Sequence, residues 1–553
     1  MEAGLSIESA LDEWKAMRAQ LSDSIESYLS ACKTLGAICT RDYRTRAGST
    51  MAEQAFTQLD AELESLAAEE GALRATRFSL STLRNKSGTL APINLLPVEI
   101  LIRIFTLSTI SNCRHYNHDA VPYNFTTACV RWRRITLDTS HFWTHIDIGP
   151  GVPWELSRLM LDQATGHGPL HLHIHENELP TPGEQTRYIQ YFPLGLMRKL
   201  KPYIHRVYGL ELSSRKYLDG CFAARMAEFW FEHGDKDLVR SLSIHQRTHN
   251  NEVLFDEPEE NTSVLNTSGR GKEILLSLRV LQLHGARFNW NSNAYRGLID
   301  LRLGFVSKSR ISSVSSSELA RVLMASPMLA VLKLKGLKVT CAEDLMQNIL
   351  VPLNRLHVLN LTEMSSESLK QILPLIFLPK ASSTELRIGL GVCDALENEL
   401  YNFFAQSSIT TLYCICKPSS FGAWSSILSS VRSLHTLVLD MEGCHLKDHI
   451  SSLPDDTVSQ LTVAGSCPFS LVLRRCLPAY EDLSGLAFKL GVQELRIQDP
   501  VLPEDFGITP SAEEYWESIR TSLMQAYPNL RYALEQRDSF GNLYQDISPG
   551  CWP

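Results

Sequence analysis

Three histidines that alternate along one short segment are the residues of this chain whose spacing most suggests chemistry. The segment PLHLHIH, from Pro169 to His175, alternates apolar residues with histidines as a β-strand does. His171, His173 and His175 would therefore share one strand face. Imidazole is a common metal ligand, so a metal-dependent enzyme is one interpretation. Side chains on one strand face splay along it, however, and we expect these three not to converge on one ion.

Cys414 and Cys416 form a second suggestive pair, a Cys-x-Cys inside another strand-like segment. Without a second pair they are weak metal or redox candidates, and we expect small core residues. The chain contains no Gly-rich phosphate loop, no Gly-x-Ser-x-Gly and no His-Glu-x-x-His. We therefore expect no catalytic residues, no cofactor and no metal.

Composition limits the classes of protein to consider. The 553 residues suffice for several domains or one long repeat array, and a net charge of -8 without a dense basic run argues against nucleic-acid binding. The acidic N-terminus lacks a secretory signal, and no run reaches the roughly 20 apolar residues of a membrane span. Thirteen scattered cysteines, an odd number, suggest reduced thiols. We expect a cytoplasmic or nuclear protein that does not bind membranes.

A phrase of alternating leucines recurs through most of the chain and predicts a series of short strands. It begins at Tyr208, Val239, Leu278, Leu298, Leu329, Leu356, Thr384, Ile409, Leu434, Ser470 and Val492, and HIDI at His145 precedes it. Aligning Leu332, Leu359, Leu386, Leu412 and Leu437 gives separations of 27, 27, 26 and 25 residues. The segments between have helical leucine spacing after a Ser or Asp that can cap a helix, as in SSELARVLMAS from Ser316.

This period and phrase resemble leucine-rich repeats. The resemblance implies an α/β solenoid over residues 149–545, in which each repeat buries its leucines against its neighbours. We expect a polar insertion near 246–272 and a final cap, a helix from about Glu513 to Ala526 followed by a strand. The Asn that usually ends the phrase survives only at Asn360. Unrelated α/β domains are the alternative.

The stretch from Leu95 to Ile148 predicts a small all-helical domain. Pro97 stands where a first helical position should be, and Glu99 favours the positive end of a helix. An apolar stripe with helical spacing follows, made of Ile100, Leu101, Ile104 and Phe105. A second helix is indicated by Phe125, Ala128, Cys129, Trp132 and Ile135, after a polar loop, and Phe142 and Trp143 come next.

LPVEIL, IRIF and ACVRWRRITLDTSHFW resemble, in this order, the F-box motif. The matching residues are Leu96, Pro97, Glu99, Ile100, Leu101, Ile104, Phe105, Cys129, Trp132, Arg133 and Trp143. The usual Asp-Leu step before the second helix is missing, and the loop from Ser111 to Tyr123 takes its place, as in fungal F-box proteins with leucine-rich repeats. Packing of the same residues into a core of their own is the alternative interpretation.

The resemblance implies an F-box-like domain at 89–148 in a substrate-recognition adaptor of a Skp–cullin–F-box ubiquitin ligase. The protein would be a non-catalytic subunit whose repeats bind an unknown target protein. Its contacts with a Skp-type adaptor, and through that adaptor with a cullin, would come from Leu96, Pro97, Ile100, Leu101, Ile104, Phe105, Cys129, Trp132 and Trp143. The alternative function is a cytosolic leucine-rich-repeat scaffold with no ligase link.

Residues 1–88 predict two helices with heptad seams. The first seam runs through Trp14, Leu21, Ile25, Tyr28, Cys32, Leu35 and Cys39, and the second through Phe56, Leu59, Leu63, Leu66, Leu73 and Leu80. Glu70 and Arg77 occupy alternate positions of the second seam and weaken it. We favour an antiparallel hairpin within one chain, with pairing between two chains as the alternative.

Overall fold

The computed structural model describes twenty segments of the chain. They are residues 7–44, 49–86, 92–112, 121–149, 154–164, 168–176, 194–214, 221–246, 253–255, 269–305, 313–341, 350–378, 386–390, 396–407, 409–415, 434–440, 470–475, 483–484, 492–498 and 512–535. The chain forms two compact units, residues 1–101 and 102–553. The first is helical and the second contains a parallel sheet, which confirms the α/β class. None of the described helices is both long and apolar enough to cross a membrane.

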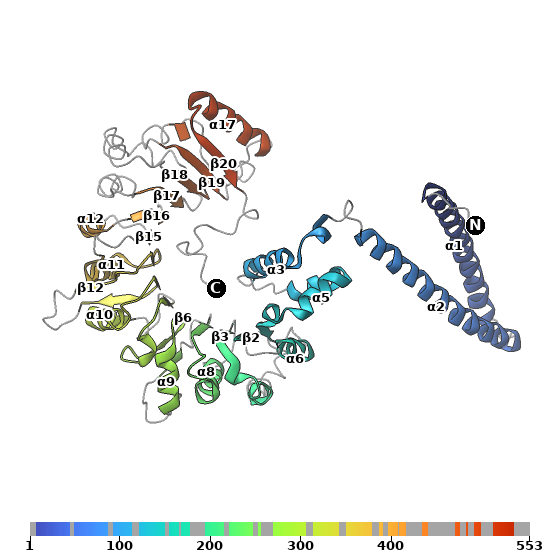
Figure 1. Ribbon diagram of the computed structural model, residues 1–553, viewed down its shortest axis with the longest axis horizontal. Helices are drawn as coiled ribbons and strands as arrows, with labels where there is room; N and C mark the ends of the chain where they lie inside the picture. Colours follow the sequence, from blue (N-terminus) through green and yellow to red (C-terminus); the bar gives the residue numbers. More distant parts are fainter. Residues whose placement is uncertain are drawn as a thin grey trace. The chain divides into compact units, whose positions relative to one another are not determined.

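Two long helices dominate the first unit (Figure 1). They are α1 (Ile7–Arg44) and α2 (Ser49–Lys86), followed by the 3-10 turn η1 (Pro92–Leu95). Both predicted helices are thus present, and the two contact each other. Side chains of both predicted seams nevertheless remain exposed, among them Leu21 and Ile25 of α1 and Leu66 and Leu73 of α2. In this structure the two helices therefore do not pack against each other along these exposed seam residues.

Short helices connect the long ones to the sheet. They are α3 (Val98–Asn112), α4 (Val121–Ala128), α5 (Val130–Asp138) and the 3-10 turn η2 (Ser140–Trp143). The single helix predicted from Phe125 to Ile135 is wrong, because the chain breaks at Cys129, whose φ of -160° and ψ of 166° are extended. The Cys129 Sγ accepts a hydrogen bond from the Trp132 amide at 3.4 Å and so caps α5.

A parallel sheet in strict chain order forms the body of the second unit. Its strands are β1 (His145–Ile148), β2 (Leu170–Glu176), β3 (Val207–Ser214), β4 (Ser241–Gln246), β6 (Val280–His284), β8 (Asp300–Gly304), β10 (Val331–Lys335), β13 (Val358–Leu361), β15 (Leu386–Leu390), β16 (Ile409–Ile415), β17 (Thr436–Asp440), β18 (Ser470–Arg474), β19 (Glu494–Gln498) and β20 (Arg531–Glu535). Every leucine phrase found in the sequence lies in or overlaps one of these strands.

Leucines in register form a ladder across the sheet. Leu301 pairs with Leu332 and Leu332 with Leu359, and all three are fully buried. The ladder then continues through Ile388, not through the expected Leu386, to Leu412. Leu386 and Ile388 are two residues apart and share a strand face, so sequence spacing alone does not show which of them joins the ladder. The register of β15 against β16 also shifts between Leu386 and Arg387.

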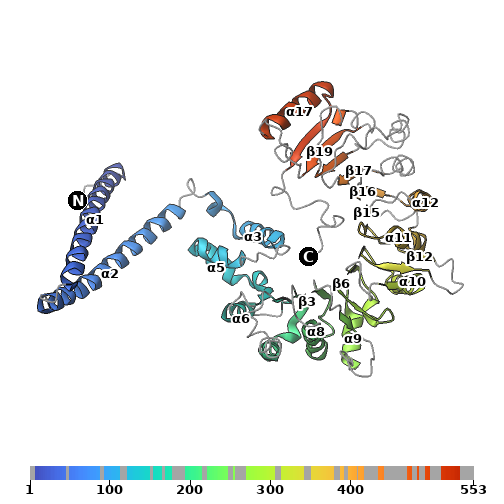
Figure 2. The ribbon, with the colours of Figure 1, turned by 180° about the vertical axis from the view of Figure 1, so that it is seen from behind.

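Helices return the chain between strands and lie along one side of the sheet (Figures 1 and 2). They are α6 (Trp154–Gln163), α8 (Cys221–His233), α9 (Gly269–Ser277), α10 (Ser316–Met324), α11 (Ser366–Ile372), α12 (Glu397–Gln406) and α17 (Ala512–Ala526). The predicted Ser caps are present at Ser315, which forms a capping box with Glu318, and at Ser365. The other face of the sheet carries the residues that alternate with the leucines.

Short strand pairs accompany some returns, namely β5 (Val253–Phe255) with β7 (Ala286–Phe288), β9 (Ser313–Ser315) with β11 (Lys338–Thr340), and β12 (Val351–Pro352) with β14 (Ile376–Phe377). The insertion predicted at 246–272 therefore contains a strand, and its last residues begin α9. Residues 247–252 and 256–268 lie outside the described part of the chain.

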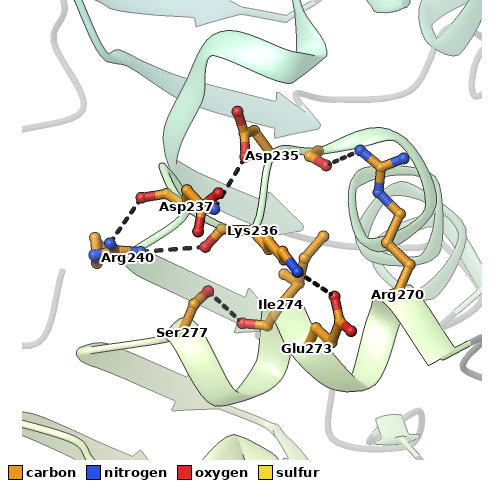
Figure 3. Close-up of polar contacts among 9 residues, drawn as sticks. Asp235, Lys236, Asp237, Arg240, Arg270, Glu273, Ile274 and Ser277 are labelled. Carbon is orange, nitrogen blue, oxygen red and sulfur yellow. Dashed lines mark hydrogen bonds and ion pairs between the residues drawn. The ribbon is translucent and has the colours of Figure 1, made fainter.

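The turn between α8 and β4 illustrates how a return is fixed (Figure 3). The Arg240 guanidinium donates to the carbonyls of Lys236 at 3.3 Å, Asp237 at 2.7 Å and Val239 at 2.6 Å. Lys236 also reaches across to Glu273 of α9, with 2.9 Å between Nζ and Oε2. One arginine thus satisfies carbonyls that the turn leaves without partners from a regular strand or helix.

Candidate functional site

Helix α3, the first helix of the predicted adaptor site, exposes one side of its apolar stripe and buries the other. Ile100 is 48% exposed, whereas Leu101 and Phe105 are 0% and 1% exposed. Pro97 is also exposed, and Leu96 and Ile104 are half-buried. A partner can therefore contact the side of α3 that carries Ile100, while Leu101 and Phe105 serve the interior.

The buried side of α3 belongs to an aromatic cluster. The Phe105 ring stacks on Phe125 with 4.2 Å between centroids, and the Trp132 ring meets its edge at 4.9 Å. Phe142 lies 6.1 Å away from it. Stacked and edge-on geometries are the favourable ones for aromatic pairs. These residues of the predicted motif therefore fix α3, α4, α5 and η2 against one another.

Polar side chains in and after the Cys-x-x-Trp-Arg segment also form hydrogen bonds within the fold. Arg133 Nε donates to the Thr126 carbonyl of α4 at 2.7 Å, which bridges the break at Cys129. The buried Trp143 donates through Nε1 to the Thr136 carbonyl at 2.8 Å. Of the predicted adaptor-binding residues, Trp143 is thus a structural residue, while Cys129 and Trp132 are half-buried.

Histidines from two neighbouring strands gather on the sheet face opposite the leucines. His145 of β1 pairs in register with His171 of β2, and their rings stack 4.6 Å apart at 6°. His145 Nδ1 also lies 3.2 Å from Nε2 of His173. The next strand leaves room for His171, because a Cβ on Gly209 would lie 2.8 Å from its Nδ1. The expectation that the histidines of β2 share one face is confirmed.

Glu211 of β3 favours a positive charge on one histidine of this row, His173. Its Oε2 lies 2.9 Å from Nδ1 of His173, and the two side chains are 21% and 13% exposed. Burial alone would lower the pKa of His173, but the hydrogen bond and charge of Glu211 outweigh it and raise that pKa. The same contact overcomes burial at Glu211 and lowers its pKa to about 2. An imidazolium–carboxylate pair results.

Two imidazoles of the row, those of His145 and His171, are kept neutral. Desolvation lowers the pKa of His145 to about 3, with the charges of His171 and His173 adding to the effect. Burial likewise lowers the pKa of His171 to about 4. His175 Nε2 lies 3.7 Å from Oδ1 of Asp147. Within the described segments, no three His, Cys, Asp or Glu side chains are grouped so that they could hold a metal ion.

A second polar cluster lies on the same sheet face, further along the chain. The Asp440 carboxylate is 2% exposed, accepts a hydrogen bond from the Tyr413 hydroxyl, and pairs with Arg475 Nε at 2.6 Å. Arg475 is 44% exposed and has a φ of 49°, in the left-handed region that non-Gly residues rarely adopt. Arg474 approaches the Tyr413 hydroxyl at 3.4 Å. Charged groups thus stand at both ends of this face.

Sequence reasoning found the histidines of β2 but not their partners. His145, Glu211 and Asp440 lie far from their partners along the chain, and the strand register brings them together. One signal in the sequence could have found them. The residues that alternate with the leucines in each phrase lie on the same sheet face as the histidines. Of the cysteine pair, Cys414 is buried as expected, and Cys416 lies outside the described residues.

Comparisons with known proteins identify no family. No protein-family profile matches the chain, and no curated protein matches it. Solved structures that match include a Bacteroides fragilis protein from a structural genomics programme, with 11% sequence identity and a TM-score of 0.28 over 71% of this chain and 79% of that one. A similarity of this size supports no conclusion about fold or function.

Proposed function

We propose that this protein is a substrate-recognition adaptor of a Skp–cullin–F-box ubiquitin ligase. The observation that carries the proposal is that some residues of the F-box-like motif are buried in a core while others are exposed. Phe105, Trp132 and Trp143 build a local core, while Pro97, directly before α3, and Ile100 on α3 remain exposed. An apolar side chain left in water on a helix that is otherwise well anchored is what a partner-binding surface requires.

The sheet supplies the proposed recognition surface. Consecutive parallel strands, a buried leucine ladder and helical returns along one side support a leucine-rich-repeat-like solenoid. Its other face, where the Arg475 side chain is 44% exposed and Glu211 is 21% exposed, would bind the target protein. The polar and charged character of these clusters favours a target segment with polar and charged groups of its own.

The proposed mechanism is proximity. A Skp-type adaptor would bind the exposed side of α3 and link the chain to a cullin, and the sheet would hold the target near a charged ubiquitin carrier. Tethering raises the effective concentration of the target's lysines without a catalytic group on this chain. The cytosol and nucleus, where ubiquitin ligases of this kind act, are the proposed locations.

Binding of a purified recombinant Skp-type adaptor tests the proposal. Ile100→Asp places a charge at the exposed centre of the surface, so we expect at least about a tenfold loss of affinity. Ile299→Asp is the matched control, because Ile299 is 43% exposed in the second unit and lies outside the motif. Both variants should melt like the wild type. Phe105 is unsuitable for this test, since loss of a buried ring would impair folding.

Failure of the wild-type chain to bind the adaptor would sink the ligase proposal. Equal loss of binding in both variants would also count against it, because the loss would not be specific to α3. In the first case the alternative is a cytosolic repeat scaffold that self-associates through its N-terminal helices. The exposed seams of α1 and α2 are the observation that favours that alternative.

A further inference from the structure

Helix α2 presents a row of exposed leucines along one side. Leu63, Leu66, Leu73, Leu80 and Leu83 are 40 to 63% exposed. Their spacings of three and seven residues place them on one broad helical stripe. The contact with α1 within the chain leaves this stripe in water. A stripe of this length is a surface for another helix.

The charges of α2 are segregated along its length. Its first half carries Asp60, Glu62, Glu64, Glu69 and Glu70, and its second half carries Arg74, Arg77 and Arg84. Leu73 separates these two groups, and the eight side chains named are exposed. The helix is therefore acidic at one end and basic at the other, with an apolar stripe connecting them.

This arrangement fits a second copy of α2 in the opposite direction. A twofold axis near Leu73 would place the acidic half of each helix beside the basic half of the other, with Glu69 near Arg77 of the second copy. A parallel pair would instead set Glu70 against Glu70 and Arg77 against Arg77 within the seam, and like charges there are unfavourable.

We propose that the protein dimerises through antiparallel pairing of α2 with α2 of a second copy. Covering a half-exposed leucine removes roughly 50 Å² of apolar surface, so the five leucines of both copies provide about 500 Å². With the polar flanks, which make up somewhat less than half of a typical interface, the total is about 900 Å². Interfaces of this size form weak dimers, so association should depend on concentration.

Dimerisation goes beyond the proposed ligase function and does not depend on it. A dimer would carry two copies of the sheet face, so a target with two binding segments would be held more tightly than by one copy. The adaptor-binding test on α3 and the self-association test on α2 use different residues, and either result can hold without the other.

Light scattering of the full chain over roughly 1 to 100 μM is the first test, and we expect the mass to rise from monomer towards dimer. An acidic variant, Arg74→Glu, Arg77→Glu, Arg84→Glu, and a basic variant, Glu62→Lys, Glu69→Lys, Glu70→Lys, should each remain monomeric. An equimolar mixture should dimerise, because opposite charges then face each other. The control Glu13→Lys, Asp23→Lys, Glu26→Lys changes charge equally on α1 and should dimerise like the wild type.

Orientation is tested by disulfide trapping between a Glu69→Cys chain and an Arg77→Cys chain. The antiparallel pair should give the mixed disulfide, detected by mass spectrometry of peptides, while prevalent Arg77→Cys homodisulfides would show a parallel pair and overturn the proposal. A wild-type chain that stays monomeric throughout the range would also overturn it. In that case α1 of the same chain would cover the leucine stripe of α2. Circular dichroism should show equal helix content in all variants.

Discussion

Glu211→Gln should destabilise the sheet in a way that depends on pH. The substitution keeps the shape of the side chain but removes the charge that lies 2.9 Å from His173 Nδ1. Burial of His173, the largest influence on its pKa, is then opposed only by the charge of Asp147, the weakest one, so the pKa should fall from a raised value to one below the ordinary value of about 6.5.

The size of the effect follows from the depressed pKa of Glu211. A shift from the ordinary 4.5 to about 2 corresponds to an upper limit of about 3 kcal/mol. Water reaches a fifth of the Glu211 side chain, which is 21% exposed, and reduces the effect. We therefore expect Glu211→Gln to lower the free energy of unfolding by about 1–2 kcal/mol at pH 5.5.

The pH window is set by both partners. A carboxylate with a lowered pKa stabilises the fold above pH 4.5, and this contribution disappears as the pH falls towards 2. A histidine with a raised pKa stabilises the fold below pH 6.5, and this contribution disappears as the pH rises through its folded value. The difference between wild type and variant should thus be largest between about pH 4.5 and 6.5. His145 and His171, whose pKa values are lowered, destabilise both proteins below pH 6.5.

Denaturant unfolding between pH 3 and 8 measures the difference, and NMR titration of the His173 ring measures the pKa itself. Glu494→Gln is the matched control, because Glu494 pairs at 2.8 Å with Arg496, which keeps its charge throughout this range. Its effect should not decline above pH 6.5. Equal stability of wild type and Glu211→Gln at pH 5.5, or a difference that is the same at every pH, would refute the reasoning.

Two further substitutions test the packing of the returns by thermal denaturation. Arg240→Ala removes the donor to three turn carbonyls and should cost about 1–2 kcal/mol, whereas Lys236→Ala, which breaks an exposed pair with Glu273, should leave stability unchanged; equal effects would contradict this view of the turn. Gly336→Ala should cost about 2 kcal/mol or more, because Gly336 has a φ of 62° and an added Cβ would press on the Phe305 carbonyl oxygen. Gly269→Ala, whose methyl would meet nothing within 4 Å, is the control and should be neutral.

The sequence predicts the strands of this protein well because their signal is local. Leucines alternate with other residues within each phrase, and the serines that cap α10 and α11 directly precede their helices. Asn360 is a similar case, since its Oδ1 accepts from the amide and hydroxyl of Thr362 only two residues away. Such features need no knowledge of the rest of the fold.

What the sequence did not predict depends on partners distant in the chain. The contact of His173 with Glu211 needs the register of β2 against β3, and the choice of Ile388 over Leu386 needs the register of β13 against β15. The break at Cys129 has a local cause, but the stripe of apolar residues continues across it and conceals it. Pattern reasoning therefore places elements more reliably than it pairs their side chains.

The exposed side of α3 carries apolar residues in a regular spacing. Ile100 and Leu107 are 48% and 52% exposed and, with the half-buried Ile104 between them, recur every three or four residues along one side of the helix. Apolar side chains that water still reaches contribute little to stability, and polar residues at these positions would serve the fold as well. Leu101 and Phe105 already anchor the helix from its buried side. We propose that a second protein covers the exposed Ile100, and the Ile100→Asp experiment tests this proposal.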